Sequence, residues 1–105
     1  TRTIAYKMVA GFAKDELFSG VTTIRTVGGL GNFDTRLRDE IESGTKLGPR
    51  ILAANQGISV PGGHMAGSVA VAASTIPDAL KQLEKAKQEK VDLIKLMITG
   101  GVLFC

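Results

Sequence analysis

The fold of this chain is indicated by one nearly unbroken apolar run, Val91-Asp92-Leu93-Ile94-Lys95-Leu96-Met97-Ile98, which leads into Thr99-Gly100-Gly101. Such a run is typical of a strand that is covered on both faces, as in a parallel sheet between helices. Strand alternation places Leu93, Lys95 and Met97 on one face of this strand. The run therefore predicts a layered α/β architecture and gives a first candidate functional residue, Lys95.

Upstream of this run, a helix is followed by a strand. Residues 3–18 have helical periodicity, and we expect their stripe of Ile4, Met8 and Phe12 to face the core. Residues 21–27 are rich in β-branched side chains and end at a glycine pair, which predicts a strand.

A second helix–strand pair follows. Asp34 is a suitable cap for a short helix that ends at Gly44, with Leu37 and Ile41 facing inward. The apolar run 50–54 predicts the next strand, which we expect to continue through 56–60.

The third helix comes after a longer connection. Residues 65–74 are small and only mildly apolar, and they predict a long loop. Thr75 resembles a helix cap and opens a helix to about Lys90, with Ala79, Leu83 and Ala86 on its inner face. The order helix, strand, helix, strand, helix, strand implies parallel strands joined by right-handed crossovers.

Three glycine pairs, at 28–29, 62–63 and 100–101, follow the three predicted strands. Ligands of α/β proteins bind at the carboxyl ends of parallel strands, so we expect a site where these pairs meet. The nucleotide-binding patterns G-x-G-x-x-G and G-x-x-x-x-G-K-[ST] are both missing from the sequence.

Lys95 and His64 are the candidate functional residues. A lysine inside a covered strand is expected to have a lowered pKa, and its neutral amine can form a Schiff base or a carbamate. It can also extend to solvent with no function, which is the outcome we favour for Arg25. His64, the only histidine, follows a glycine pair and suits substrate contact or acid–base work. An exposed loop histidine without a task is the alternative.

Composition excludes several classes of protein. The chain has 105 residues, a net charge of +3, 44% hydrophobic and 22% charged residues, which excludes disordered and collagen-like chains. Its basic residues alternate with acidic ones, as in 81–85, and stacking aromatics are lacking, so we expect no nucleic-acid partner. The single Cys105 suits a reducing compartment, and no run reaches the ~20 apolar residues of a membrane helix. We expect a cytoplasmic protein without a membrane partner.

Five segments, in order and across nearly the whole chain, resemble the metal-dependent amidohydrolase superfamily, in its imidazolonepropionase and prolidase-like branch. They are Gly20-Val21-Thr22-Thr23-Ile24-Arg25 with Gly28-Gly29, Leu37-Arg38-Asp39-Glu40-Ile41 with Gly44, Gly48-Pro49-Arg50-Ile51-Leu52-Ala53, Gly62-Gly63-His64, and Asp92-Leu93-Ile94-Lys95-Leu96-Met97 with Thr99-Gly100-Gly101-Val102. The chain departs from the family pattern at Thr26 and at Met65-Ala66.

The resemblance implies a (β/α)8 barrel that holds one or two divalent metals, with zinc as the expected ion. The metal would activate water for attack on an amide-type C–N bond in a small molecule or dipeptide, including dipeptides of the Xaa-Pro type. It further implies that Lys95 is a metal ligand as a carbamate, that His64 lies beside the substrate, and that the parent is a homo-oligomer.

Length then limits the interpretation. A (β/α)8 barrel typically needs ~250 residues, so we expect residues 1–105 to form one incomplete TIM-barrel domain, from the helix after strand one to strand four. The family's other metal ligands would lie outside this chain, and we expect the chain alone to be inactive and to bind no metal well. Two alternatives remain: a Schiff-base lyase or aldolase that uses Lys95, and a non-enzymatic α/β domain that self-associates.

Overall fold

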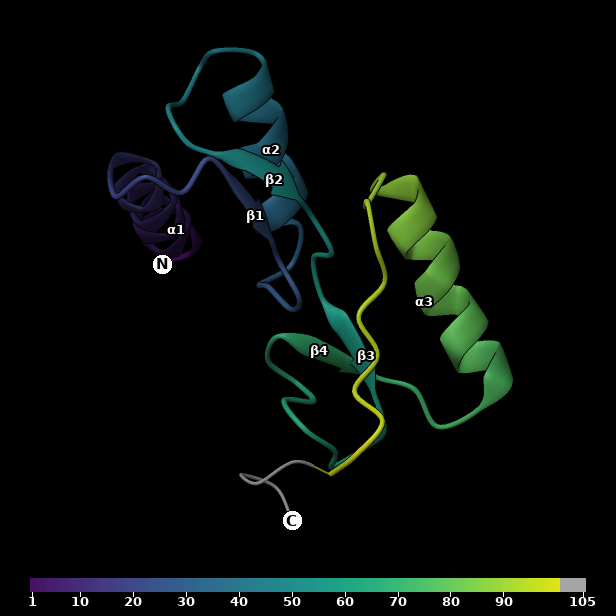
Figure 1. The fold of residues 1–105 in the computed structure, drawn as a ribbon. Helices are drawn as coiled ribbons and strands as arrows, with labels where there is room; N and C mark the ends of the chain where they lie inside the picture. The colour runs from purple at the N-terminus through teal and green to yellow at the C-terminus, as the bar shows by residue number, and fades with distance from the viewer. Residues whose placement is uncertain (101–105) are drawn as a thin grey trace.

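Three helices and four short strands follow one another along residues 1–100, the part of the chain that the computed structural model describes. In order they are α1 (Arg2–Phe18), β1 (Thr23–Arg25), α2 (Phe33–Glu42), β2 (Arg50–Leu52), β3 (Gly57–Ser59), β4 (Ala70–Ala72) and α3 (Ile76–Gln88), as Figure 1 shows. The predicted α/β alternation is therefore present up to β2, after which β3 and β4 follow without an intervening helix.

The three predicted helices are confirmed, with one change of cap. Thr75 caps α3, and its hydroxyl oxygen accepts a hydrogen bond from the backbone N–H of Asp78 at 3.3 Å, as the capping pattern predicts. The N-cap of α2 is Asn32 and not Asp34, which lies in the first turn of that helix and is buried. The prediction of Asp34 as the cap was therefore wrong by two positions.

The strands form two small parallel sheets. β1 pairs with β2 in the register Thr23 to Arg50 through Arg25 to Leu52. β3 pairs with β4 in the register Gly57 to Ala70 through Ser59 to Ala72. Parallel pairing agrees with the prediction from the alternating elements.

Two strand predictions are corrected between residues 50 and 74. β2 ends at Leu52 because the chain soon takes a left-handed conformation at Asn55, with φ of 58°, and β3 then begins as a separate strand. The predicted loop over 65–74 contains β4, a three-residue strand whose backbone pairs with β3.

The predicted strand over 91–98 is an extended segment and not a regular strand. It runs beside β3 in Figure 1 and forms an isolated parallel bridge between Leu96 and Ile58. The backbone N–H of Ile58 donates to the Lys95 carbonyl, and that of Met97 donates to the Ile58 carbonyl, both at 2.9 Å.

The predicted alternation in this segment is confirmed, but coverage of both faces is not. Leu93, Lys95 and Met97 are half-buried, whereas the opposite face is exposed, with Leu96 at 56% and Ile98 at 90%. Within residues 1–100 that second face is therefore largely exposed, and the apolar run is only partly covered.

The core lies between α1, α2 and the β1–β2 sheet. Its buried members are Tyr6, Ala13, Phe33, Leu37, Ile51 and Ala53. The inward position predicted for Leu37 is confirmed. The predicted stripe of α1 is wrong, because Ile4, Met8 and Phe12 are more than half exposed. α1 packs through the neighbouring face, which carries the small Ala13 and the ring of Tyr6.

The third helix contributes no buried residue. Ala79 and Ala86 of its predicted inner face are half-buried, but Leu83 is exposed, which corrects that prediction. The accessible surface of 6730 Å² exceeds the roughly 5,600 Å² expected for a compact protein of this mass. Among the described residues, no helix has the length and apolar character needed to cross a membrane.

Candidate functional site

His64 and Lys95 line the same hollow, although each was singled out separately from the sequence. The hollow has a volume of about 460 Å³. It is lined by Val27, His64, Met65, Val69, Lys95, Leu96, Met97, Ile98 and Thr99. These residues follow β1, follow β3 and form the extended segment, so the hollow lies where successive parallel segments end.

His64 is positioned by a tight glycine turn. Gly62 has φ of 71°, which favours glycine, and the backbone N–H of Gly63 donates to the Val60 carbonyl at 2.8 Å. A Cβ on Gly63 would approach the Ser59 hydroxyl oxygen to 2.6 Å. The Gly-Gly-His order therefore has a steric reason, and it leaves His64 half-buried at the edge of the hollow.

Lys95 is positioned by its aliphatic stem. A Cβ on Gly57 would approach Lys95 Cγ to 3.3 Å, so the stem lies close over this buried glycine. The residue is half-buried, which is less than the full burial that the sequence predicts. It is therefore a lysine with a covered stem that reaches a hollow.

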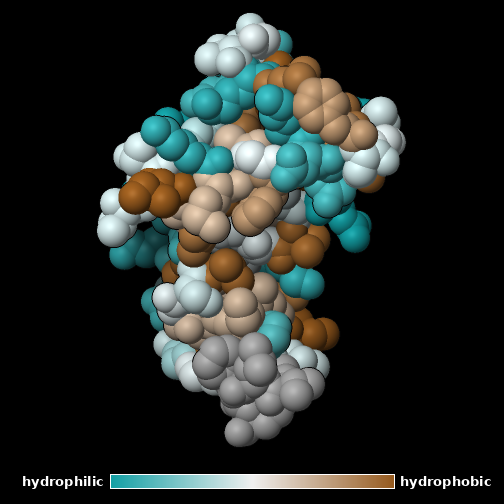
Figure 2. Space-filling model, turned by 90° about the vertical axis from the view of Figure 1, so that its left-hand side faces the viewer, coloured by the Kyte–Doolittle hydropathy of each residue, from teal (hydrophilic) through white to brown (hydrophobic). Residues whose placement is uncertain are grey.

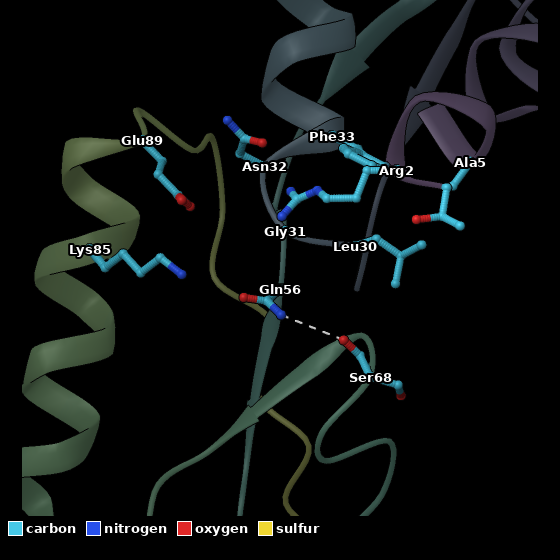
Figure 3. Close-up of a pocket in the computed structure, with 11 residues that line it drawn as sticks. Arg2, Ala5, Leu30, Gly31, Asn32, Phe33, Gln56, Ser68, Lys85 and Glu89 are labelled. Atoms are coloured by element: carbon cyan, nitrogen blue, oxygen red, sulfur yellow. Dashed lines mark hydrogen bonds between the residues drawn. The ribbon is translucent and has the colours of Figure 1, made fainter. Parts of the chain in front are cut away.

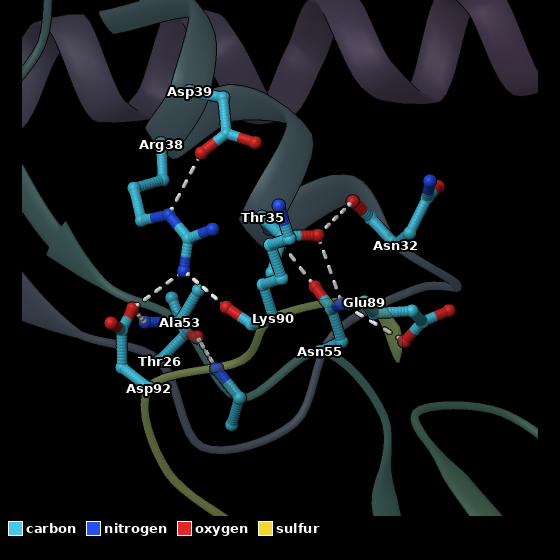
Figure 4. A network of polar contacts seen from close by, with 11 residues as sticks. Thr26, Asn32, Thr35, Arg38, Asp39, Ala53, Asn55, Glu89, Lys90 and Asp92 are labelled. Carbon is cyan, nitrogen blue, oxygen red and sulfur yellow. Dashed lines mark hydrogen bonds and ion pairs between the residues drawn. The ribbon is translucent and has the colours of Figure 1, made fainter. Parts of the chain in front are cut away.

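A partly buried ion pair holds the start of the segment that carries Lys95 (Figure 4). One carboxylate oxygen of Asp92 accepts from the backbone N–H of Ala53 and from the Arg38 guanidinium, each at 2.8 Å. Arg38 also donates to the Lys90 carbonyl at 2.8 Å, and its side chain is only 10% exposed. The Ala53 N–H, and after it the Arg38 guanidinium, lower the pKa of Asp92 below its usual 3.8.

A second buried network centres on Asn55 (Figure 4). Its side chain accepts from the backbone N–H of Thr35 and donates to the Thr35 hydroxyl, both at 3.0 Å, and donates to Glu89 at 3.1 Å. The Asn55 carbonyl accepts from the Gly29 N–H at 2.8 Å. The Asn55 side chain thus joins the start of α2 to the C-cap of α3, and its backbone carbonyl holds the loop after β1.

A buried carboxyl lies behind the loop after β1. Asp34 is 7% exposed, and a Cβ on Gly29 would approach its two carboxylate oxygens to 2.6 Å. Burial raises the pKa of Asp34 above its usual 3.8, although hydrogen bonds from Thr26 and from the Asn55 backbone oppose this.

Two of the three predicted glycine pairs lie next to the hollow at His64 and Lys95. Gly28 lies against Met97 and Val69, two residues of the hollow, and Gly62-Gly63 precedes His64. Gly101, the second member of the last pair, lies outside the described residues, as does Val102. Arg25 is exposed, as the sequence interpretation favoured.

The residues present do not complete a metal site. Residues 1–100 contain no group of three or more His, Cys, Asp or Glu side chains that could hold a metal ion. A divalent metal such as zinc takes three or four protein ligands, and the hollow offers one imidazole and one lysine.

A larger hollow, of about 590 Å³, lies between the start of α1 and α3 (Figure 3). It contains neither His64 nor Lys95. Gln56 in its wall already donates to the Ser68 carbonyl at 3.5 Å, and Glu89 accepts from Asn55. The hollow at His64 and Lys95 is the better candidate because both predicted residues meet there.

Sequence reasoning missed the residues that position the site. Asn55 lies in no motif, and although Arg38 and Asp92 lie in segments that resemble the family, no sequence pattern predicts the ion pair between them. Asp92 alone carried a signal, because a carboxylate at the start of an apolar run needs a partner when the run is buried.

Comparisons with known proteins agree with this architecture. No protein-family model matches the chain, and no curated protein matches it significantly. The solved structure of a Bifidobacterium longum protein, assigned as a prolidase by inference, is 38% identical to this chain. Its TM-score is 0.75 over 85% of the chain. A solved amidohydrolase is 21% identical, with a TM-score of 0.82 over 91% of the chain, and the A. niger ochratoxinase is 18% identical, with a TM-score of 0.85 over 96%.

The match covers only part of each neighbour. This chain spans 22% of the Bifidobacterium protein, 27% of the amidohydrolase and 28% of the ochratoxinase. The two neighbours below 25% identity show the fold alone. The structural neighbours of this chain are thus amidohydrolase-type proteins, about a quarter of whose length it spans.

Proposed function

We propose that this chain is a segment of a (β/α)8 amidohydrolase that hydrolyses amide-type C–N bonds. The observation that carries the proposal is the meeting of His64 and Lys95 in one hollow at the ends of parallel segments. The amidohydrolase-type neighbours support a hydrolase, because the chain matches them over 85–96% of its length.

In this proposal the two residues have separate roles. His64 contacts the substrate from the loop that follows β3. Lys95, as a carbamate formed with carbon dioxide by loss of one proton, would be a ligand of a divalent metal, with zinc expected, and that metal would supply an activated water. The remaining ligands would come from parts of a longer protein.

The substrate class is a small amide or a dipeptide, and the prolidase-like branch favours dipeptides of the Xaa-Pro type. The 38% identity to the Bifidobacterium protein supports this choice over other amides. A homo-oligomeric, cytoplasmic parent is part of the same proposal.

The first test is the coding sequence upstream of Thr1. We expect a His-x-His pair a few dozen residues before it, since one cluster of ligands must come from another strand. The longer protein, loaded with zinc, should hydrolyse Xaa-Pro dipeptides or N-acyl amino acids. Lys95→Ala should abolish turnover, whereas Lys81→Ala, on the exposed face of α3, should leave it unchanged.

Two results would overturn the proposal. A longer protein without the upstream histidines would remove the metal site on which it depends. Trapping of a carbonyl substrate on Lys95 by borohydride would assign the lysine to Schiff-base chemistry instead.

A further inference from the structure

Four cations surround a small hollow between α1 and α2, which neither His64 nor Lys95 lines. Its lining consists of Arg2, Thr3, Tyr6, Lys7, Asn32, Phe33, Arg36 and Lys46, and its volume is about 210 Å³. These basic residues are spread over positions 2 to 46 and form no cluster in the sequence, so no basic patch was expected. The fold brings them together because α1 contributes two and α2 with its following loop contributes the others.

The floor of this hollow is aromatic. Tyr6 and Phe33 are 3% and 4% exposed and contact each other edge to face, with ring centroids 5.3 Å apart. The Arg36 guanidinium lies 3.7 Å from the Tyr6 ring centroid, and that of Arg2 lies 5.5 Å from the Phe33 centroid. Figure 3 shows Arg2 crossing Phe33 toward Gly31. Cation–π contacts of this kind restrain the guanidinium groups before any ligand arrives.

The positive charge of the hollow is only partly balanced. Glu40 accepts from the Tyr6 hydroxyl at 2.8 Å and from Arg36 at 3.1 Å, and it lies 3.8 Å from the Lys46 ammonium. Arg2 and Lys7 form no ion pair with an acidic residue among residues 1–100. Four cations therefore face one carboxylate, which is already shared by two of them.

We propose that this hollow binds a small ligand through its phosphate groups. Guanidinium forks and ammonium groups are the side chains that recognise phosphate oxygens. The hollow, with a volume of about 210 Å³, has room for a diphosphate. Because both rings are buried beneath the cations, they offer no face on which a base can stack. The site therefore recognises the phosphates, whether they are free or belong to a nucleotide.

Titration calorimetry of the whole 105-residue chain with pyrophosphate tests this site. We expect one equivalent to bind saturably at 150 mM salt. The double variant Arg2→Gln/Lys7→Gln should lose at least tenfold in affinity. The control Lys81→Gln/Lys87→Gln removes the same charge from exposed positions of α3 and should change affinity less than twofold.

Two further measurements complete the test. A single variant at Arg36 serves if the double variant misfolds, and titration with ADP separates free phosphate from nucleotide phosphate. Arg36→Lys keeps the charge but removes the fork and should weaken binding severalfold. ADP should bind within threefold of pyrophosphate. Binding that vanishes at 150 mM salt, an equal loss in the α3 control, or a tenfold preference for ADP would each overturn the proposal.

Discussion

Two glycines, Gly63 and Gly11, differ in the space that each would leave for a side chain. Gly63 has Ser59 and Val60 atoms within 2.9 Å of the place where a Cβ would lie, whereas Gly11, in the middle of α1, has open space there. Gly63→Ala should therefore lower the free energy of unfolding by about 1–3 kcal/mol through overpacking. Gly11→Ala should raise it by about 0.5–1 kcal/mol through helix propensity.

Urea unfolding followed by circular dichroism measures both changes. The two variants add the same methyl group, so each serves as the control for the other. A stabilising Gly63→Ala would contradict the steric account of the Gly-Gly-His turn.

Two carboxyl groups near the site should titrate on opposite sides of the usual value of 3.8. Asp34 is buried, which raises its pKa, whereas Asp92 accepts from Ala53 and Arg38, which lowers its pKa. The order of their side-chain pKa values, Asp34 above Asp92, can be checked by NMR titration of the carboxyl carbons. Equal values would contradict the described contacts.

The lowered pKa of Asp92 has a consequence for acid stability. A group whose folded pKa is depressed stabilises the folded state above its unfolded pKa, and this contribution is lost as pH falls through the folded pKa. Below pH 3.8 the Asp92 contribution should therefore decline. Asp92→Asn should be less stable than the wild type at pH 7 and should show a shallower loss in acid. Asp34 has the opposite sign, because its raised pKa favours the folded state at low pH.

At the scale of elements, pairing and not hydrophobicity separates a strand from an extended segment. Residues 91–98 have the apolar composition of a covered strand, yet within residues 1–100 they pair along one edge only. The Asp92 and Met97 N–H groups donate to the Ala53 and Ile58 carbonyls, whereas the Ile94 N–H donates to no backbone carbonyl of the described residues.

Hydrogen exchange read by NMR should resolve this difference. The amides of Asp92 and Met97 should exchange more slowly than that of Ile94, since exchange needs the hydrogen bond to open. Uniform protection along 91–98 would show a regular strand with a second partner.

The same reasoning applies to α1. Its stripe of Ile4, Met8 and Phe12 has helical spacing, but the side chains are exposed, and Figure 2 shows apolar side chains among hydrophilic ones on the side where α1 lies. The spacing predicts that the helix has an apolar face, but it does not predict which of two adjacent faces packs against the core. The bulk of Tyr6 and the small size of Ala13 let the neighbouring face approach α2.

The whole molecule is more open than its length would suggest. Its radius of gyration is 14.3 Å, against about 13 Å for a compact domain of 100 residues. α3 has no buried residue, and the exposed face of 91–98 is apolar. This openness agrees with a chain that spans about a quarter of its structural neighbours.

The number of metal ligands depends on the whole molecule and not on one element. The chain by itself should bind zinc weakly, because Lys95 and His64 offer too few ligands for a closed site. Calorimetry with zinc in the presence of bicarbonate is the measurement. Tight binding of one zinc per chain would contradict the view that the site needs residues from elsewhere.

The sequence by itself determined the three helices, the parallel sense of the strands and the two residues that meet in the hollow. These follow from local information: helical period, capping residues, β-branched runs and glycine turns act over a few neighbouring positions. The alternation of Leu93, Lys95 and Met97 belongs to the same class, because a strand's two faces are fixed by its backbone.

Only the tertiary structure decided which faces are covered and what holds the site in place. The Arg38–Asp92 ion pair and the Asn55 network join residues 54 and 20 positions apart, and no local pattern encodes such contacts. The four cations of the α1–α2 hollow are likewise far apart in sequence, since two lie in α1 and two lie in or after α2. Whether an apolar stripe is buried depends on the element that approaches it, which is a property of the assembled molecule.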